Sequence, residues 1–233
     1  VGGALLFRSL WRLMAVDPGF RGERTLTLAT SLPVAGYPTG LDVRAFYTRL
    51  MERLAGMPAV AAAGASTDLP LGIRERRAFA IENERQTTRD LPHAVANEWV
   101  IGQYFDALGI PLRRGRFFTP QDDGGAEPVA VVNETMARRF WGGDDPVGQR
   151  VAWGNNTQHG RWMRIIGVVG DVKQGPLDSE IIPQIYTAWL QAGDRMLGDN
   201  VAGVFRSLRL VVKTQLEPSV MAKTIQQEVR AID

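Results

Sequence analysis

The sequence predicts an α+β fold in which a β-α-β layer, built from both ends of the chain, carries a long inserted segment. Residues 24–66 show the pattern of a strand, an amphipathic helix and a second strand. Residues 207–232 again show a strand followed by an amphipathic helix. Between them, residues 67–205 mix short strands with short helices and polar turns. Strands and helices mixed without strict alternation are typical of the α+β class.

The N-terminal unit is predicted to run from a strand at 24–33, through a helix, to a strand of small residues at 59–66. Leucines alternate with threonines in the first strand, the two-residue period of a strand with one buried face. Thr39 or Asp42 is the expected N-cap of the helix, and Gly56 is expected to end it. One face of the helix carries apolar residues at three- and four-residue intervals: Val43, Phe46, Tyr47, Leu50, Met51 and Leu54. The simplest interpretation is a pair of parallel strands with the helix on one face.

The C-terminal segment mirrors part of this unit. A strand is predicted at 207–214, and Pro218 suits the first turn of the helix that follows. The apolar face of that helix consists of Met221, Ile225, Val229 and Ile232. A second β-α-β unit needs one more strand after Asp233, so we expect a split β-α-β-β-α-β layer without its last strand.

The inserted segment is predicted to contain several short elements and one return loop at 191–207. A short helix at 102–109 is expected to turn Tyr104, Phe105 and Leu108 inward. The run "RIIGVVGDV" resembles a nucleotide-binding loop, but its glycines lie in an apolar run with no helix pattern after them. A strand with bulges is therefore the better interpretation. The other predicted strands lie at 78–83, 93–101, 110–118, 129–133 and 184–189.

The stretch "VAVVNETMARRFWGGDDPVGQRV", residues 129–151, raises the question of catalysis. Glu134 with Asp144 or Asp145 could form the carboxylate pair of a hydrolase. Asn133, however, suits the N-cap of a helix beginning at Glu134, where a carboxylate interacts favourably with the helix dipole. Asp145-Pro146 and the glycines around it are typical of a turn. We therefore favour a structural role for the whole stretch.

Other chemistries lack a pattern in this chain. There is no cysteine, no G-x-G dinucleotide fingerprint and no Gly-Lys pair of a P-loop. The two histidines, His93 and His159, do not have the spacing of a metal site. The net charge is only +2 and no Lys/Arg block occurs, which argues against nucleic-acid binding. We assign no catalytic, cofactor-binding or metal-binding residue from the sequence.

The first residues allow two interpretations. Residues 1–14 are mostly apolar, with Trp11 and two arginines near their end. They suit the outer end of a transmembrane helix, with Trp and Arg at the membrane interface. They equally suit an amphipathic helix packed on its own domain.

Several stretches together resemble the extracytoplasmic core domain of MacB-type ABC transporter permeases, in particular the group with duplicated membrane halves called duplicated orphan permeases. They occur in the family's order and cover nearly the whole chain. The stretches are "LLFRSLWRLMAVDPGF", "YFDALGIPLRRGRFFTPQD", "PVAVVNETMARRFWGGDDPVGQRV", "RIIGVVGDVKQGPLDSE" and "PQIYTAW".

This resemblance implies a division of the chain. Residues 1–20 would be the outer end of a transmembrane helix with its linker, and residues 21–66 plus 206–233 a porter-like subdomain. Residues 67–205 would form an inserted, sabre-like α+β subdomain. The resemblance places the domain on the periplasmic side of the cell inner membrane.

The resemblance also implies partners and a mechanical role. The expected partners are the rest of the permease's transmembrane region, a cytoplasmic ABC ATPase acting through it, and a second permease half or an envelope partner. The domain would transmit transmembrane conformational change to a substrate or partner in efflux, lipoprotein release or envelope regulation, without catalysis or cofactor. Two other classes remain open: a membrane-tethered ligand-binding or sensor domain, and a periplasmic hydrolase using Asp and Glu residues.

Overall fold

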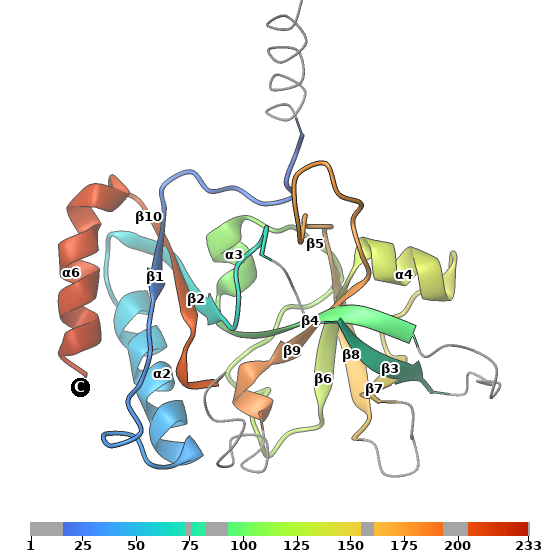
Figure 1. Ribbon diagram of the computed structural model, residues 1–233, viewed down its shortest axis with the longest axis horizontal. Coiled ribbons are helices and arrows are strands. Elements are labelled where there is room, and N and C mark those ends of the chain that lie inside the picture. Colours follow the sequence, from blue (N-terminus) through green and yellow to red (C-terminus); the bar gives the residue numbers. More distant parts are fainter. Residues whose placement is uncertain (1–15, 73–75, 83–92, 155–160, 193–204, 233) are drawn as a thin grey trace, which may run out of the picture.

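The computed structural model describes residues 16–72, 76–82, 93–154, 161–192 and 205–232. The helix expected at 1–14, most of the return loop expected at 191–207, and His159 lie outside these residues. In the described part, helices and strands combine in an α+β fold with a three-stranded layer at one end and a larger strand assembly at the other (Figure 1). No helix among the described residues has the length and apolar character needed to cross a membrane.

The three-stranded layer consists of β1 (Thr25–Ala29), β10 (Arg209–Thr214) and β2 (Val60–Ser66). β10 lies between the other two and is antiparallel to both, so β1 and β2 are parallel to each other. The prediction of parallel strands is therefore correct in direction, but β1 and β2 are not neighbours. The C-terminal strand inserts between them, because β10 can form backbone hydrogen bonds along both of its edges.

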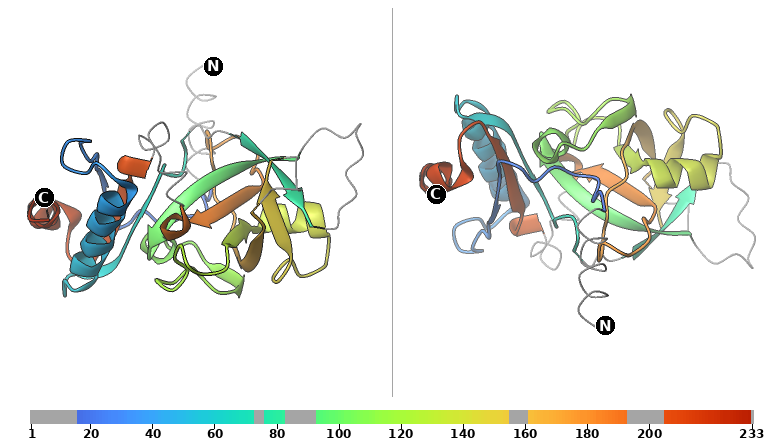
Figure 2. Two further views of the ribbon diagram at one scale, coloured as in Figure 1. Left: turned by 90° about the horizontal axis from the view of Figure 1, so that it is seen from below. Right: turned by 90° about the horizontal axis from the view of Figure 1, so that it is seen from above.

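Two helices, α2 (Gly40–Ala55) and α6 (Pro218–Arg230), pack beside each other on this layer (Figures 1 and 2). Thr39 caps α2 in a capping box, in which its side chain accepts from the Asp42 N–H and Asp42 accepts from the Thr39 N–H. Both predicted cap residues thus take part. Pro218 occupies the first turn of α6, as predicted.

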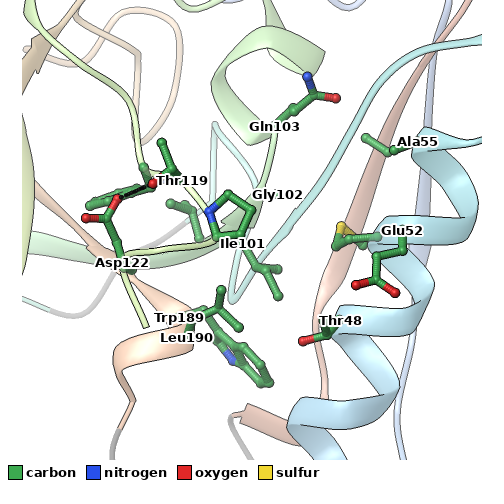
Figure 3. Close-up of a pocket in the computed structure, with 16 residues that line it drawn as sticks. Thr48, Glu52, Ala55, Ile101, Gly102, Gln103, Thr119, Asp122, Trp189 and Leu190 are labelled. Atoms are coloured by element: carbon green, nitrogen blue, oxygen red, sulfur yellow. Dashed lines mark hydrogen bonds between the residues drawn. The ribbon is translucent and has the colours of Figure 1, made fainter. Parts of the chain in front are cut away.

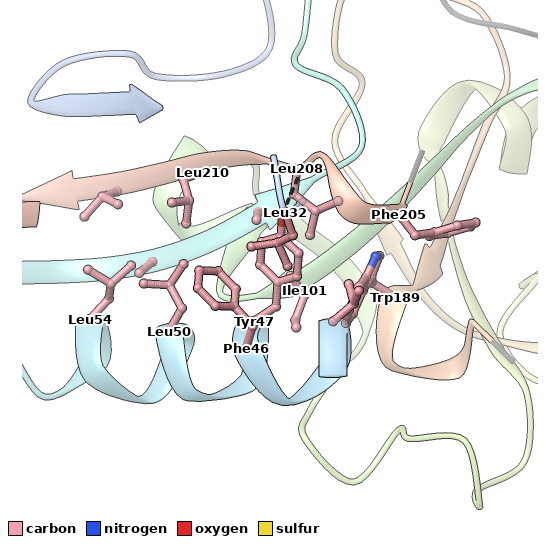
Figure 4. Close-up of a cluster of buried hydrophobic side chains, with 14 of the residues drawn as sticks. Leu32, Phe46, Tyr47, Leu50, Leu54, Ile101, Trp189, Phe205, Leu208 and Leu210 are labelled. Atoms are coloured by element: carbon pink, nitrogen blue, oxygen red, sulfur yellow. Dashed lines mark hydrogen bonds between the residues drawn. The ribbon is translucent and has the colours of Figure 1, made fainter. Parts of the chain in front are cut away.

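The core of the layer gathers the apolar face of α2 around Tyr47 (Figure 4). Tyr47 is fully buried, and its ring packs edge-on against Trp189 at a centroid distance of 5.3 Å. Its hydroxyl donates to the Arg206 carbonyl at 2.9 Å and accepts from the Leu208 N–H at 3.2 Å. One side chain therefore fixes α2 to the segment that leads into β10.

Six further strands form a closed ring, hereafter the six-stranded ring. Its pairings run β4–β3–β7–β8–β6–β9 and return to β4. The bounds are β3 (Arg76–Ile81), β4 (His93–Gly102), β6 (Val129–Asn133), β7 (Arg150–Trp153), β8 (Met163–Val169) and β9 (Gln184–Ala188), with β5 (Leu112–Gly115) added outside on β8. All six strands contribute to one apolar cluster, which also includes Met136. Closure leaves these strands fewer free edges than an open sheet would.

β4 joins the ring to the three-stranded layer. Its first residues pair with β3, its middle pairs with β9, and its last three residues pair with β2. The short helix α3 (Tyr104–Leu108) follows at once and packs against β2 and β10. Tyr104, Phe105 and Leu108 are buried there, as predicted, in a cluster shared by the layer and the ring.

Helix α4 (Glu134–Trp141) follows β6 and packs on β6, β8 and β9 of the ring. The side chain of Asn133 accepts from the Met136 N–H at 3.0 Å, which confirms the predicted N-cap. The same buried oxygen also accepts from the Gln184 N–H at 2.9 Å, so the cap is part of the ring. The bulge predicted in the run "RIIGVVGDV" is present in β8, where Ala130 pairs with Ile165 and Val131 pairs with Gly167.

Candidate functional site: a cleft between the layer and the ring

A cleft of about 390 Å³ lies where the three-stranded layer meets the six-stranded ring (Figure 3). One wall is the flank of α2. The opposite wall is the loop of residues 117–122 that follows β5. The floor is formed by Ala63 of β2, the ends of β4 and β9, and the short 3₁₀ helix η1 (Trp189–Gln191). The volume lies in the range of pockets that bind small molecules, roughly 300–1,000 Å³.

The α2 wall comes from a second face of the helix. Thr48, Met51, Glu52 and Ala55 line the cleft and follow one another at helical intervals of three, one and three residues. This stripe lies beside the core stripe that packs on the sheet. Figure 3 shows Thr48 and Glu52 on the cleft side of α2, across from Thr119 and Asp122. The helix therefore serves the core with one face and the cleft with the next.

The opposing loop is held by Asp122. Its carboxylate accepts two hydrogen bonds from Arg116, at 2.7 and 2.8 Å, and one from the Thr119 N–H at 2.8 Å. Burial raises the pKa of Asp122, but the bonds from Arg116 and the Thr119 backbone outweigh it and hold the pKa below its ordinary value. Phe117 stacks on Phe105 at 5.0 Å, which ties the loop to α3.

The floor depends on two glycines that face each other. Gly64 of β2 pairs directly with Gly102 of β4, and Gly102 has a φ of +69°. A Cβ at Gly102 would lie 2.8 Å from the Met51 sulfur and 2.8 Å from the Ala63 carbonyl oxygen. Glycine at both positions lets the two backbones approach closely enough to close the floor.

The carboxylates considered from the sequence lie elsewhere, near α4. Glu134 and Asp144 line a smaller depression of about 180 Å³ together with three arginines. Glu134 pairs with Arg113 at 3.2 Å, and Asp145 pairs with Arg114 at 3.7 Å. Val147 N–H donates to the Asp145 carboxylate at 3.0 Å, which fixes the turn that the sequence predicts there. These contacts are structural: they hold α4 and its following turn against β5.

An unforeseen residue, Asp171, completes the start of α4. It accepts from the Thr135 N–H at 2.8 Å and from Arg138 at 2.9 Å. Two of the helix's free N–H groups, those of residues 135 and 136, thus have carboxylate or amide partners.

His93, one of the two histidines considered as metal ligands, packs against the rings of Phe79 and Phe140, at centroid distances of 5.4 and 4.8 Å. The residues that the structure describes contain no group of three or more His, Cys, Asp or Glu side chains arranged to hold a metal ion.

The sequence did not point to the cleft. Glu52 and Ala55 lie outside the apolar stripe of α2, and a charged or small residue there is ordinary for a solvent-facing helix position. Asp122 lies in the polar run "TPQDDGGAEP", which indicates only a turn. The sole usable signal was the aromatic pair Phe117-Phe118 directly before that turn.

Comparison with known proteins agrees with this architecture. The crystal structure of the periplasmic region of MacB from Actinobacillus actinomycetemcomitans superposes with a TM-score of 0.56 at 17% identity, over 95% of this chain and 89% of that chain. The extracellular domain of the noncanonic ABC-type transporter YknZ from Gram-positive bacteria gives 0.50 at 18% identity, over 89% of this chain and 92% of that chain. At these identities, the two comparisons show that the folds are similar.

Sequence comparison gives the family. The macrolide export ATP-binding/permease protein MacB of Aggregatibacter actinomycetemcomitans is 25% identical over 138 residues, which are 59% of this chain and 20% of that protein. The matched segment therefore spans about a fifth of that relative's length. The family described as MacB-like periplasmic core domain matches residues 13–232. The chain belongs to the MacB-like periplasmic core domains of ABC-type permeases.

Proposed function

We propose that this domain transmits movement of a permease's transmembrane helices to a substrate or partner outside the membrane. The observation that carries the proposal is the cleft. Its two walls come from different parts of the chain: α2 belongs to the layer, and the 117–122 loop lies between β5 and β6, outside the layer. A change in the angle between layer and ring would change the width of the cleft, and with it the affinity for whatever the cleft holds. The transmembrane region and the cleft would thus be coupled through a conformational change, without any covalent bond being made or broken.

The proposal includes a division into two subdomains, residues 21–66 plus 206–233 and residues 67–205. The three-stranded layer lies within the first and the six-stranded ring within the second. Between the strands of the described residues, the layer and ring meet at the short β2–β4 pairing of three residue pairs. So short a ladder is a reasonable place for bending.

The remaining parts of the proposal concern the whole permease. We place the domain on the periplasmic side of the inner membrane, attached through residues 1–20 to the transmembrane region. A cytoplasmic ABC ATPase would act through that region, and a second permease half or an envelope protein would be the neighbour outside. We also propose that the domain has no catalytic role.

The test uses distances across the cleft in the full-length permease with its ATPase. The chain described here contains no cysteine, so labels are introduced cleanly in this domain. Ala55→Cys on α2 and Pro120→Cys on the opposing loop carry spin labels, and both positions are exposed and line the cleft. Pulsed electron resonance then compares the distance distribution in nucleotide-free and ATP-trapped states. We expect the distribution to shift between the two states.

The control pair is Ala55→Cys with Thr224→Cys. It places one label on α2 and the other on α6, and both helices pack on the three-stranded layer. We expect this distribution to stay unchanged with nucleotide. An unchanged Ala55–Pro120 distance during active ATP turnover would remove the mechanical proposal. A shift of both pairs would mean that the layer itself deforms, which also contradicts it.

A second candidate is a membrane-tethered ligand-binding or sensor domain, and the apolar cleft is the observation that favours it. The same labels separate the two functions. A sensor would change the Ala55–Pro120 distance on ligand addition but not on ATP binding.

A further inference from the structure

We propose that the cleft binds a small hydrophobic organic cation, with Glu52 as the group that recognises its positive charge. This inference rests on the proposed function in one respect, since it takes the cleft to be the place where the domain meets its substrate. It goes further by naming the chemistry of the ligand and the residue that selects it.

The lining of the cleft is predominantly apolar. Its apolar residues include Ile101 and Trp189 from the floor, Met51 and Ala55 from α2, and Phe118 and Pro120 from the loop. Apolar walls of this kind favour a ligand with an apolar body, at roughly 25 cal/mol for each Å² removed from water. The cleft lies between two secondary-structure assemblies, where small-molecule sites are frequent.

The charged residues that line the cleft are both acidic. Its described lining contains no Lys, Arg or His, and its two acidic residues are Glu52 and Asp122. The Asp122 carboxylate is already satisfied by the paired bonds from Arg116. An anionic ligand would therefore find no cation in this lining to pair with it.

Glu52 supplies the unbalanced charge. Among the described residues it forms no ion pair, although two arginines lie near it on the same helix. Arg49 donates to the Ala45 carbonyl at 3.2 Å, and Arg53 pairs with Glu228 on α6 at 3.2 Å. Both arginines are thus engaged away from the cleft. A ligand cation seated against the apolar floor would meet this carboxylate at the α2 wall.

An aromatic side chain adds to the preference for a cation. Phe118 lines the cleft and is partly exposed, and a well-placed aromatic face attracts an organic cation by about 0.5–2 kcal/mol. Small polar groups at the rim, the Thr48 hydroxyl and the Gln103 amide, are available to a ligand's own polar atoms. The arrangement therefore resembles a cation site with an apolar floor and one carboxylate at the edge.

The test uses two probes of nearly equal size and opposite charge, tetraphenylphosphonium and tetraphenylborate, in sodium buffer. Binding to the isolated 233-residue chain is measured by calorimetry and by backbone amide shifts in NMR spectra. We expect saturable one-site binding of the cation, with the largest shifts at Ala55, Gly102 and Thr119. Binding of the anion is expected to be at least several-fold weaker. No saturable binding, or tighter binding of the anion, would overturn the proposal.

Substitutions of Glu52 assign the charge recognition. Glu52→Gln is expected to weaken tetraphenylphosphonium binding by about threefold to fivefold, the upper range for a partly exposed ion pair. Glu52→Lys is expected to reverse the preference, so that tetraphenylborate binds more tightly than the cation. Glu217→Gln removes an exposed carboxylate outside the cleft and is expected to leave both affinities unchanged. Equal affinities in the wild-type chain and in both Glu52 variants would refute the role of Glu52.

A fourth variant, Ala55→Trp, locates the ligand. Ala55→Trp fills the α2 side of the cleft without changing its charge, and it should weaken both probes at least tenfold while circular dichroism shows an intact fold. Unchanged binding in this variant would place the ligand elsewhere and overturn the proposal. Because these measurements use no nucleotide and no membrane, their failure leaves the ATP-dependent movement of the cleft walls as a separate question. Failure of that movement would equally leave the binding result standing.

Discussion

Gly64 and Gly102 pair directly at the joint between the three-stranded layer and the six-stranded ring, and neither position has room for a side chain. A Cβ on Gly64 would lie 2.4 Å from the Tyr104 backbone nitrogen. The obstacle is backbone at the start of α3, so no side-chain rotation can relieve it. The closeness of layer and ring is therefore set at these two residues.

We expect Gly64→Ala to destabilise the domain by about 1–3 kcal/mol, the usual cost of forcing an extra methyl group into packed structure. Urea unfolding of the isolated chain, followed by circular dichroism, measures this change. Gly143→Ala is the matched control, because no atom lies within 4 Å of the Cβ it would add. We expect that variant to remain within about 0.5 kcal/mol of the wild type. Equal stability of the two variants would contradict the argument.

Local signals in the sequence predicted local structure well. The capping box of Thr39 and Asp42, the N-cap at Asn133 and the proline at 218 each act on neighbouring backbone groups, so a short stretch of sequence contains both partners. The alternation in β1 and the stripe on α2 likewise report which face is buried. The fold class followed from the order of such elements.

The long-range pairings could not be predicted in the same way. Nothing in β10 indicates that it inserts between β1 and β2, or in β9 that it closes the ring on β4. These choices depend on contacts between residues more than 80 positions apart, such as Asn97 and Ile185. The cleft depends on them in turn, since Glu52 and Asp122 line one cleft only after the layer and ring have come together. The charge balance of the cleft therefore could not be predicted from the sequence.

The N-cap at Asn133 leads to a second prediction. We expect Asn133→Ala to cost about 2–3 kcal/mol, because it leaves the buried Met136 and Gln184 N–H groups without partners. Thr39→Ala removes a cap of the same kind at an exposed helix start, where water replaces the lost bond, and should cost only about 1 kcal/mol. Urea unfolding of both variants provides the comparison. If the two variants lose similar free energies of unfolding, the bond from Asn133 to the Gln184 N–H adds nothing to the stability of the ring.

Tyr47 gives a third prediction. Tyr47→Phe keeps the ring but removes the acceptor of the Leu208 N–H, while the Arg206 carbonyl keeps its bond from the Leu32 N–H, so we expect a loss of about 1–3 kcal/mol. Thr30 lies 2.9 Å from the same hydroxyl. In a double-mutant cycle with Thr30→Val, we expect the two losses to fall short of additive, because both variants disrupt one network. Strict additivity would mean that the Thr30 contact contributes nothing.

The last prediction concerns the wall of the cleft at acidic pH. The folded pKa of Asp122 is below its ordinary value, so its contribution to stability is fully present above the unfolded pKa, about 3.9, and is lost as pH falls through the folded pKa. Asp122→Asn should therefore be less stable than the wild type by a constant amount above about pH 5, and this difference should shrink below about pH 4. Thermal unfolding from pH 3 to 7 measures the two curves. Asp178→Asn, which removes an exposed carboxyl outside this network, is the matched control and is expected to remain within about 0.5 kcal/mol of the wild type at pH 7. A difference for Asp122→Asn that stays constant down to pH 3 would contradict the role assigned to its bonds with Arg116 and Thr119.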